Sequence, residues 1–258
     1  MSLELASYAK INWCPGCPNN QILVAFRKAV TELCTAGTLR EENIVAGAGI
    51  GCHAKILDYL NMNTFNALHG RALPAIEGMK AANPSLTVVA FSGDGDSYSE
   101  GLSHLVHAAQ RNSDINVFIH DNQIFALTTG QATATSPRGF KGLTRPTGSI
   151  EEPIDPLRLM MTSGATFVAR TYAGEIEKTK EIMKAALLHK GMSFVDIAQP
   201  CITFFDTRDF YKEHITWLPS DHDVTNQDAA YHATKRNDDK VPMGIFYRVE
   251  RPTFEEQL

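Results

Sequence analysis

The sequence predicts an α/β fold whose core is a doubly wound, mainly parallel β-sheet. Short apolar runs of strand length alternate along the chain with longer stretches of helical periodicity. Such alternation implies right-handed crossovers that place helices on both faces of a sheet. Glycine-rich or polar tracts directly follow several of the apolar runs, which is typical of parallel strands that end at a ligand-binding edge.

The first predicted helix covers residues 20–35, because apolar side chains recur there at spacings of three and four. The apolar, glycine-rich run at 44–50 predicts a buried strand that opens into a loop where the backbone approaches another group. A second helix is expected over 71–82, ended by the Asn–Pro pair that follows it. The continuous apolar run at 86–91 predicts the next strand.

The pattern continues in the same order beyond this strand. A helix is expected to begin near Ser99, and strands are expected at 115–119 and 165–172. An amphipathic helix at 175–189 leads to a last strand at 194–198. These elements place one folded domain within residues 1–201.

Residues 202–258 have a different composition. They carry many charges and scattered aromatic side chains without a clear period. This pattern predicts an irregular C-terminal extension that wraps around the first domain or contacts a partner.

Charge and composition exclude several classes of protein. The 258 residues are 43% hydrophobic and 21% charged, as in ordinary globular proteins. With 24 basic and 29 acidic residues and a net charge of −5, no basic surface is expected for a nucleic acid or an anionic membrane. The sequence has neither a run of roughly 20 apolar residues for a membrane span nor a signal-peptide pattern. We therefore expect a cytoplasmic protein with no nucleic acid or membrane partner.

Chemically suggestive residues follow four predicted strands, namely Cys52, the Gly93–Asp94–Gly95 turn, the Asp121–Asn122 pair and Cys201. Because the carboxyl ends of parallel strands share one edge of a sheet, we expect these residues to lie together. A carboxylate on one strand end and an amide on the next are suited to hold Mg²⁺ against a diphosphate, and the glycines and the following helix would accept the anion. Taken alone, the Gly-Asp-Gly-Asp turn could equally be a strand-to-helix turn capped by aspartate.

Four of the five cysteines suggest a second site. Cys14 and Cys17 present two thiolates from one tight turn, and Cys52 and Cys201 can join them if their strands are neighbours. Four thiolates suit zinc and an iron–sulfur cluster equally well. Cys52, however, adjoins the glycine segment expected to bind the diphosphate cofactor, and this position favours an electron acceptor next to the cofactor. Cys34 falls on the apolar face of the first helix, which predicts a core thiol.

Four segments in this order resemble a known family. The stretch GDGDSYSEGLSHLVHAAQRNSDINVFIHDNQIFALTTGQ, with WCPGC at 13–17, GIGCH at 49–53 and LHGRALP at 68–74, strongly resembles the beta subunit of 2-oxoacid:ferredoxin oxidoreductases. The resemblance covers residues 12 to about 201. It implies the diphosphate-binding module of the thiamine diphosphate-binding fold, with thiamine diphosphate, Mg²⁺ and a [4Fe-4S] cluster as cofactors.

The resemblance also assigns site residues. Those expected to line thiamine diphosphate are Ile50, Gly51, Cys52, His53, His69, Gly95, Asp96, Ala126 and Leu127. The expected Mg²⁺ ligands are Asp94, Asn122 and the carbonyl of Ile124, and the expected cluster ligands are Cys14, Cys17, Cys52 and Cys201. His69 and Lys55 are the catalytic candidates, Lys55 because the family can place a basic residue near the substrate. The sequence departs from the family at Pro18 and at Ala126, where glycine is usual.

The implied reaction is the oxidative decarboxylation of a 2-oxo acid, or its reverse, with coenzyme A as acyl acceptor and ferredoxin as electron carrier. The implied partner is an alpha-type subunit that carries the aminopyrimidine-binding domain and its glutamate, with gamma- and delta-type subunits as further candidates. Two alternatives remain: a non-oxidative thiamine diphosphate enzyme, and a non-enzymatic metal-binding or electron-transfer module that uses the four cysteines.

Overall fold

A computed structural model describes residues 4–235 and 240–258. Its main sheet is built from the strands β1 (Ile44–Ala48), β2 (Asn63–Asn66), β3 (Thr87–Gly93), β4 (Asn116–Asp121), β7 (Phe167–Tyr172), β8 (Ser193–Ala198), β9 (Ile215–Trp217) and β10 (Val241–Arg248). Their order across the sheet is β2-β1-β3-β4-β8-β7-β10-β9. Pairing is parallel except between β10 and β7, so the predicted mainly parallel α/β fold is confirmed.

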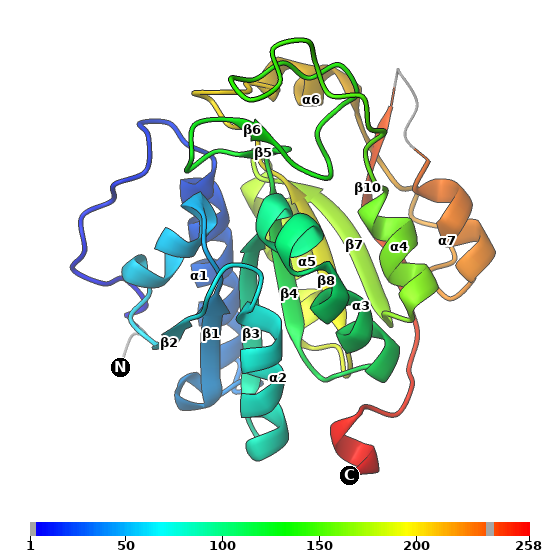
Figure 1. Cartoon of the computed structure of the whole chain (residues 1–258). Coiled ribbons are helices and arrows are strands. Elements are labelled where there is room, and N and C mark those ends of the chain that lie inside the picture. Colours follow the sequence, from blue (N-terminus) through cyan, green and yellow to red (C-terminus); the bar gives the residue numbers. More distant parts are fainter. Residues whose placement is uncertain (1–3, 236–239) are drawn as a thin grey trace.

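Helices cover both faces of this sheet (Figure 1). One face packs against α1 (Asn19–Thr35) and α5 (Ile176–Leu187). The other packs against α2 (Ala72–Ala82), α3 (Leu102–Arg111), α4 (Pro156–Ser163) and α7 (Gln227–Ala233). Alternate residues of each central strand enter the two cores, with Val89 on the α1 side and Val88 on the α2 side, as the two-residue period of a strand requires.

The strands β1, β3, β4 and β8 end at one edge of the sheet, where Figure 1 shows the loop that carries β5 (Ile124–Phe125) and β6 (Gln131–Ala132). The turn after β3 continues as a π-helix over Gly95–Glu100 before α3 begins at Leu102. A helix was expected to start near Ser99, so the chain turns helical earlier than its periodicity indicates. Wide helical turns of this kind are rare and are frequent at functional sites.

The C-terminal segment is more regular than its sequence indicates. Beyond residue 201 it forms α6 (Arg208–His214), β9, α7 and β10. The antiparallel pairing of β10 with β7 makes this segment part of the main sheet. The expectation of an irregular extension is therefore corrected, whereas the domain boundary at residue 201 and a partner contact stay predictions. No helix in the described ranges is both long and apolar enough to cross a bilayer.

Candidate functional site

The carboxyl edge of the sheet holds a pocket that contains the residues assigned to thiamine diphosphate. Its lining comprises Ile50, Gly51, Cys52, His53, His69, Gly93, Asp94, Gly95, Asp96, Asn122, Ile124, Phe125, Ala126, Leu127 and Thr128. All nine residues expected around the coenzyme, and all three expected Mg²⁺ ligands, are in this set. The lining also contains Gly93, from the predicted Gly-Asp-Gly turn, and two residues that no sequence pattern indicated, Phe125 and Thr128.

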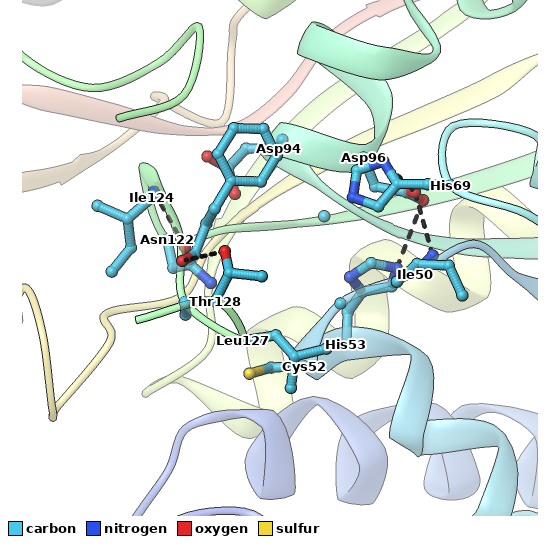
Figure 2. A pocket seen from close by; sticks show the side chains of 15 residues that line it. Ile50, Cys52, His53, His69, Asp94, Asp96, Asn122, Ile124, Leu127 and Thr128 are labelled. Atoms are coloured by element: carbon cyan, nitrogen blue, oxygen red, sulfur yellow. Dashed lines mark hydrogen bonds and ion pairs between the residues drawn. The ribbon is translucent and has the colours of Figure 1, made fainter. Parts of the chain in front are cut away.

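Asp96 organises one side of this pocket, as Figure 2 shows. Its carboxylate accepts hydrogen bonds from the backbone N–H of Ile50 at 3.1 Å and of Gly70 at 2.6 Å, and from Ser92 Oγ at 2.6 Å. His53 Nε2 lies 3.5 Å from Oδ2 and His69 Nδ1 lies 3.6 Å from Oδ1. One buried carboxylate thereby fixes the segments after β1 and before α2.

The surroundings of Asp96 keep it ionised. Burial raises the pKa of its carboxyl, but the His53 imidazole, Ser92 Oγ and the Gly70 N–H outweigh this effect and lower the pKa to about 2. A carboxylate that accepts several hydrogen bonds in its charged form has this behaviour. Asp96 is therefore a hydrogen-bond acceptor and a positioning group at neutral pH.

Gly49 is required by the packing of this carboxylate. A Cβ at Gly49 would overlap the Asp96 carboxylate, whereas a Cβ at Gly78, inside α2, would have no heavy atom within 4 Å. We expect Gly49→Ala to destabilise the fold by about 1–3 kcal/mol through overpacking and to weaken coenzyme binding. Gly78→Ala should stabilise α2 by about 0.5–1 kcal/mol. Urea denaturation of both variants measures these changes, and equal stabilities for the two would contradict the packing argument.

Asp94 and Asn122 occupy the opposite side of the pocket (Figure 2). Asp94 is 1% exposed, and its Oδ2 accepts hydrogen bonds from Thr133 Oγ1 at 2.5 Å and Thr135 Oγ1 at 3.1 Å. Burial raises the pKa of Asp94 to about 6, although these threonines lower it. Asn122 Oδ1 accepts a hydrogen bond from the Ile124 N–H at 3.1 Å, which fixes the direction of the amide. The threonines follow β6, too far along the chain for strand-end reasoning to have identified them.

A second pocket adjoins the first and contains the four cysteines assigned to a cluster. It is lined by Asn12, Trp13, Cys14, Cys17, Asn19, Cys52, Lys55, Asn122, Ala126, Gln199, Cys201, Ile202, Thr203 and Phe204. Cys52, Asn122 and Ala126 belong to both pockets. Cys34 lines neither of them and packs partly buried against the core on the α1 side.

The four thiols influence one another. Burial, with a smaller contribution from the charges of Cys14, Cys52 and Cys201, raises the pKa of Cys17 to about 11, against a backbone hydrogen bond that lowers it. Burial also raises the pKa of Cys52, which Lys55 opposes. The four thiols thus line one pocket and their charges act on one another. Within the described ranges, no three His, Cys, Asp or Glu side chains converge as for one metal ion.

Cys52 and Cys201 line the same pocket although their strands are not adjacent. The sequence made their meeting conditional on neighbouring strands, and this condition is not met, because β3 and β4 lie between β1 and β8. The segments beyond the strand ends bring the two residues together instead. Trp13 contributes to this arrangement, because its indole Nε1 donates to the Cys52 carbonyl at 2.6 Å.

Lys55, Pro18 and Ala126 lie at the second pocket or beside one of its cysteines. Lys55 lines the second pocket, and its Nζ lies 3.5 Å from the Asn12 carbonyl; its catalytic role stays a prediction. Pro18 occupies the N-cap position of α1, directly after Cys17, without a side-chain capping hydrogen bond. Ala126, the second expected departure from the family, lines both pockets.

Two family models match the chain. Residues 49–197 match the model described as thiamine pyrophosphate enzyme, C-terminal TPP binding domain. Residues 201–258 match the model for the C terminal of the pyruvate ferredoxin oxidoreductase beta subunit. Neither match includes the N-terminal cysteine turn.

Similar proteins cover nearly the whole chain. The 2-oxoacid:ferredoxin oxidoreductase 1 subunit beta of Aeropyrum pernix is 37% identical over 96% of this chain and 81% of its own length. A 2-oxoglutarate synthase subunit of Methanocaldococcus jannaschii is 33% identical over 95% of this chain and 90% of its own. The solved 2-oxoglutarate:ferredoxin oxidoreductase of Magnetococcus marinus, with 2-oxoglutarate, coenzyme A and succinyl-CoA bound, is 35% identical with a TM-score of 0.94, over 98% of this chain and 86% of that one.

Proposed function

Since this chain belongs to the family of 2-oxoacid:ferredoxin oxidoreductase beta subunits, we propose that it holds thiamine diphosphate through Mg²⁺ in the first pocket and a [4Fe-4S] cluster in the second. The main support for this proposal is that the two pockets share a wall, which is made by Cys52, Asn122 and Ala126. The enzyme is an oxidoreductase, and coenzyme and cluster on the two sides of this wall would be direct neighbours for electron transfer.

The residues of the first pocket fit a magnesium diphosphate. A carboxylate from Asp94, an amide oxygen from Asn122 and the Ile124 carbonyl are hard oxygen donors of the kind that Mg²⁺ prefers. Beside them, a Cβ at Gly93 would lie 2.8 Å from His53 Nδ1, and one at Gly95 would overlap the Phe125 ring. Because these two residues have no side chain, their backbone N–H groups are accessible where the anion would bind.

The second pocket fits a cluster by the chemistry of its donors. Four thiols from three separate segments surround one hollow, and soft thiolates are the usual ligands of iron–sulfur clusters. The same four sulfurs would also suit zinc. The wall shared with the coenzyme pocket favours the cluster, since a structural zinc has no reason to adjoin the coenzyme.

In the bound state, thiamine diphosphate supplies the electron sink for decarboxylation, and a cluster accepts electrons singly. The chain's own residues bind and orient. Asp94, Asn122 and Ile124 anchor the diphosphate end, and Asp96 holds the Ile50 and Gly70 backbones against the pocket. The coenzyme therefore performs the chemistry of decarboxylation, and the protein holds the coenzyme in position.

The substrate class follows from the relatives. Proteins named for 2-oxoacids and for 2-oxoglutarate are both similar to this chain, and the Magnetococcus marinus structure contains coenzyme A and succinyl-CoA. We propose a coenzyme A-dependent oxidative decarboxylation of a 2-oxo acid, or its reverse, with ferredoxin as the electron carrier.

A partner subunit is proposed to complete the coenzyme site. Ile50 and Leu127 line the first pocket and are 42% and 48% exposed, and Leu68, next to His69, is 78% exposed. Apolar side chains exposed together at the edge of a pocket are typical of an interaction surface. An alpha-type subunit with the aminopyrimidine-binding domain would cover them. Gamma- and delta-type subunits are further candidates in the complex.

The test is whether a 2-oxo acid and coenzyme A reduce the cluster. We expect the visible absorption of the complex with its alpha-type subunit to bleach on adding both compounds. The chain alone, loaded with cluster, Mg²⁺ and coenzyme, should show less than about one hundredth of this rate, because effective catalysis needs a fully positioned coenzyme. Comparable turnover by the single chain would refute the need for a partner, and a colourless, iron-free complex would refute the cluster.

A further inference from the structure

A buried amide side chain connects the two pockets. Gln199 directly follows β8, is 1% exposed and lines the second pocket, which contains the four cysteines. Its Nε2 lies 4.0 Å from Cys17 Sγ, and its Oε1 lies 3.5 Å from Asn122 Nδ2. One side chain therefore contacts a cysteine expected to hold the cluster and an asparagine expected to hold Mg²⁺.

The surroundings of Gln199 determine which way its amide points. Nε2 donates to the Pro200 carbonyl at 3.0 Å, and a carbonyl can only accept. The backbone N–H of Gln199 donates to the Asp121 carbonyl at 2.8 Å, which ties residue 199 to the end of β4. Asn122 is oriented as well, because its Oδ1 accepts from the Ile124 N–H and its Nδ2 must then face Gln199. The side-chain N–H of Gln199 thus points to the Cys17 sulfur, and its side-chain oxygen points to Asn122.

A second side chain donates to a neighbouring cysteine. Thr203 Oγ1 lies 3.4 Å from Cys14 Sγ, on the segment that follows Cys201. Thr203 lines the second pocket, and no hydrogen bond of the described residues joins it to Asn122. It therefore provides a comparison in which only the sulfur contact is present.

We propose that Gln199 is a positioning residue that acts on both sites: its N–H raises the reduction potential of the cluster through Cys17, and its oxygen holds Asn122 in the orientation that binds Mg²⁺. Thr203 acts on the cluster alone, through Cys14. This inference rests on the [4Fe-4S] cluster and Mg²⁺ sites of the proposed function.

The direction of the effect follows from charge. Reduction adds one negative charge to a cluster, and part of that charge resides on the cysteine sulfurs. A hydrogen bond to sulfur stabilises the more negative state more strongly, so it raises the reduction potential. Removal of the donor should lower the potential, whereas loss of the Asn122 contact should weaken coenzyme binding without a change in iron content.

The test compares Gln199→Met, Thr203→Val and Thr203→Ser with wild type in the complex with the partner subunit. Redox titration followed by EPR measures the potential, and titration with thiamine diphosphate and Mg²⁺ measures coenzyme affinity. Gln199→Met should lower the equilibrium constant for reduction about tenfold, which is about 59 mV for a one-electron couple, and weaken coenzyme affinity roughly three- to tenfold. Thr203→Val should lower the potential alone, and Thr203→Ser, which keeps the hydroxyl, should match wild type.

A wild-type potential in Gln199→Met would overturn the inference, as would equal potentials in Thr203→Val and Thr203→Ser. Unchanged coenzyme affinity in Gln199→Met would overturn its action on Asn122. If Gln199→Met does not retain iron, Gln199→Asn, whose shorter amide cannot reach Cys17, should give the same lowered potential. A wild-type complex that lacks iron would refute the proposed function instead.

Discussion

Serine in place of Cys14, Cys17, Cys52 or Cys201 should abolish the iron–sulfur cluster, and Cys34→Ser should leave it intact. The four pocket cysteines surround one hollow, and a serine oxygen is a poor substitute for a soft thiolate. Cys34 packs against the α1 side of the core, where its sulfur is explained by packing. Iron and sulfide analysis of the five purified variants measures the outcome, with near-complete loss expected in four of them.

The Cys34→Ser variant is the matched control in this series. It makes the same atomic change on the same chain, at a position outside both pockets. Iron loss at Cys34 equal to that of the other variants would force a new ligand set. Zinc without iron or sulfide in the wild type would instead assign the same four thiolates to a structural metal.

Asp94→Asn should abolish coenzyme retention and stabilise the coenzyme-free protein. The substitution removes the only carboxylate among the proposed Mg²⁺ ligands, so the diphosphate would lose its bridge to the protein. In the coenzyme-free fold, burial raises the pKa of Asp94 from 3.8 to about 6. Ionised Asp94 therefore destabilises that fold at neutral pH, and the neutral amide avoids this cost, by roughly 1–3 kcal/mol.

The sign of this effect makes it dependent on pH. Because the folded pKa of Asp94 is raised, its favourable contribution is complete below pH 3.8 and is lost as the pH rises through about 6. In urea denaturation without coenzyme, the stability advantage of Asp94→Asn over wild type should be largest above pH 7 and should shrink as the pH falls toward 4. Asp209→Asn, at a side chain 90% exposed on α6, is the control and should change neither property. Full coenzyme occupancy in Asp94→Asn would remove Asp94 from the Mg²⁺ site.

The sequence was sufficient where local pattern and tertiary structure agree. The central strand β3 is largely a continuous apolar run, and β4 and β8 are mainly apolar segments of strand length, so the positions of these buried strands follow from the local sequence. The site residues at their carboxyl ends follow from the geometry of parallel sheets. Each of these predictions depends on one segment or on the shared direction of several strands.

Elements that depend on distant contacts were missed. β2 has four exposed residues and pairs along an edge of the sheet, so burial gives it no pattern. β10 contains Pro242 and a register shift near Ile245, and only half of it is buried. At the site, Thr133 and Thr135 reach Asp94 across about 40 residues through a loop. Gln199, by contrast, stands at a predicted strand end, and strand-end reasoning could have identified it.

The spacing of the cysteines along the chain gives the second pocket a mechanical consequence. The intervals from Cys17 to Cys52 (35 positions) and from Cys52 to Cys201 (149 positions) would be closed as loops by a bound cluster, and closure of long loops restricts an unfolded chain. Residues 4–18 form no helix or strand and are held by the isolated bridge from Ala6 to Leu60, by the buried side chains of Leu5 and Trp13 and by hydrogen bonds such as that from Trp13 to Cys52. A cluster bound by Cys14 and Cys17 would add a further tether. Oxidative destruction of the cluster would release that tether, so the N-terminal arm would become the first site of proteolysis in damaged protein.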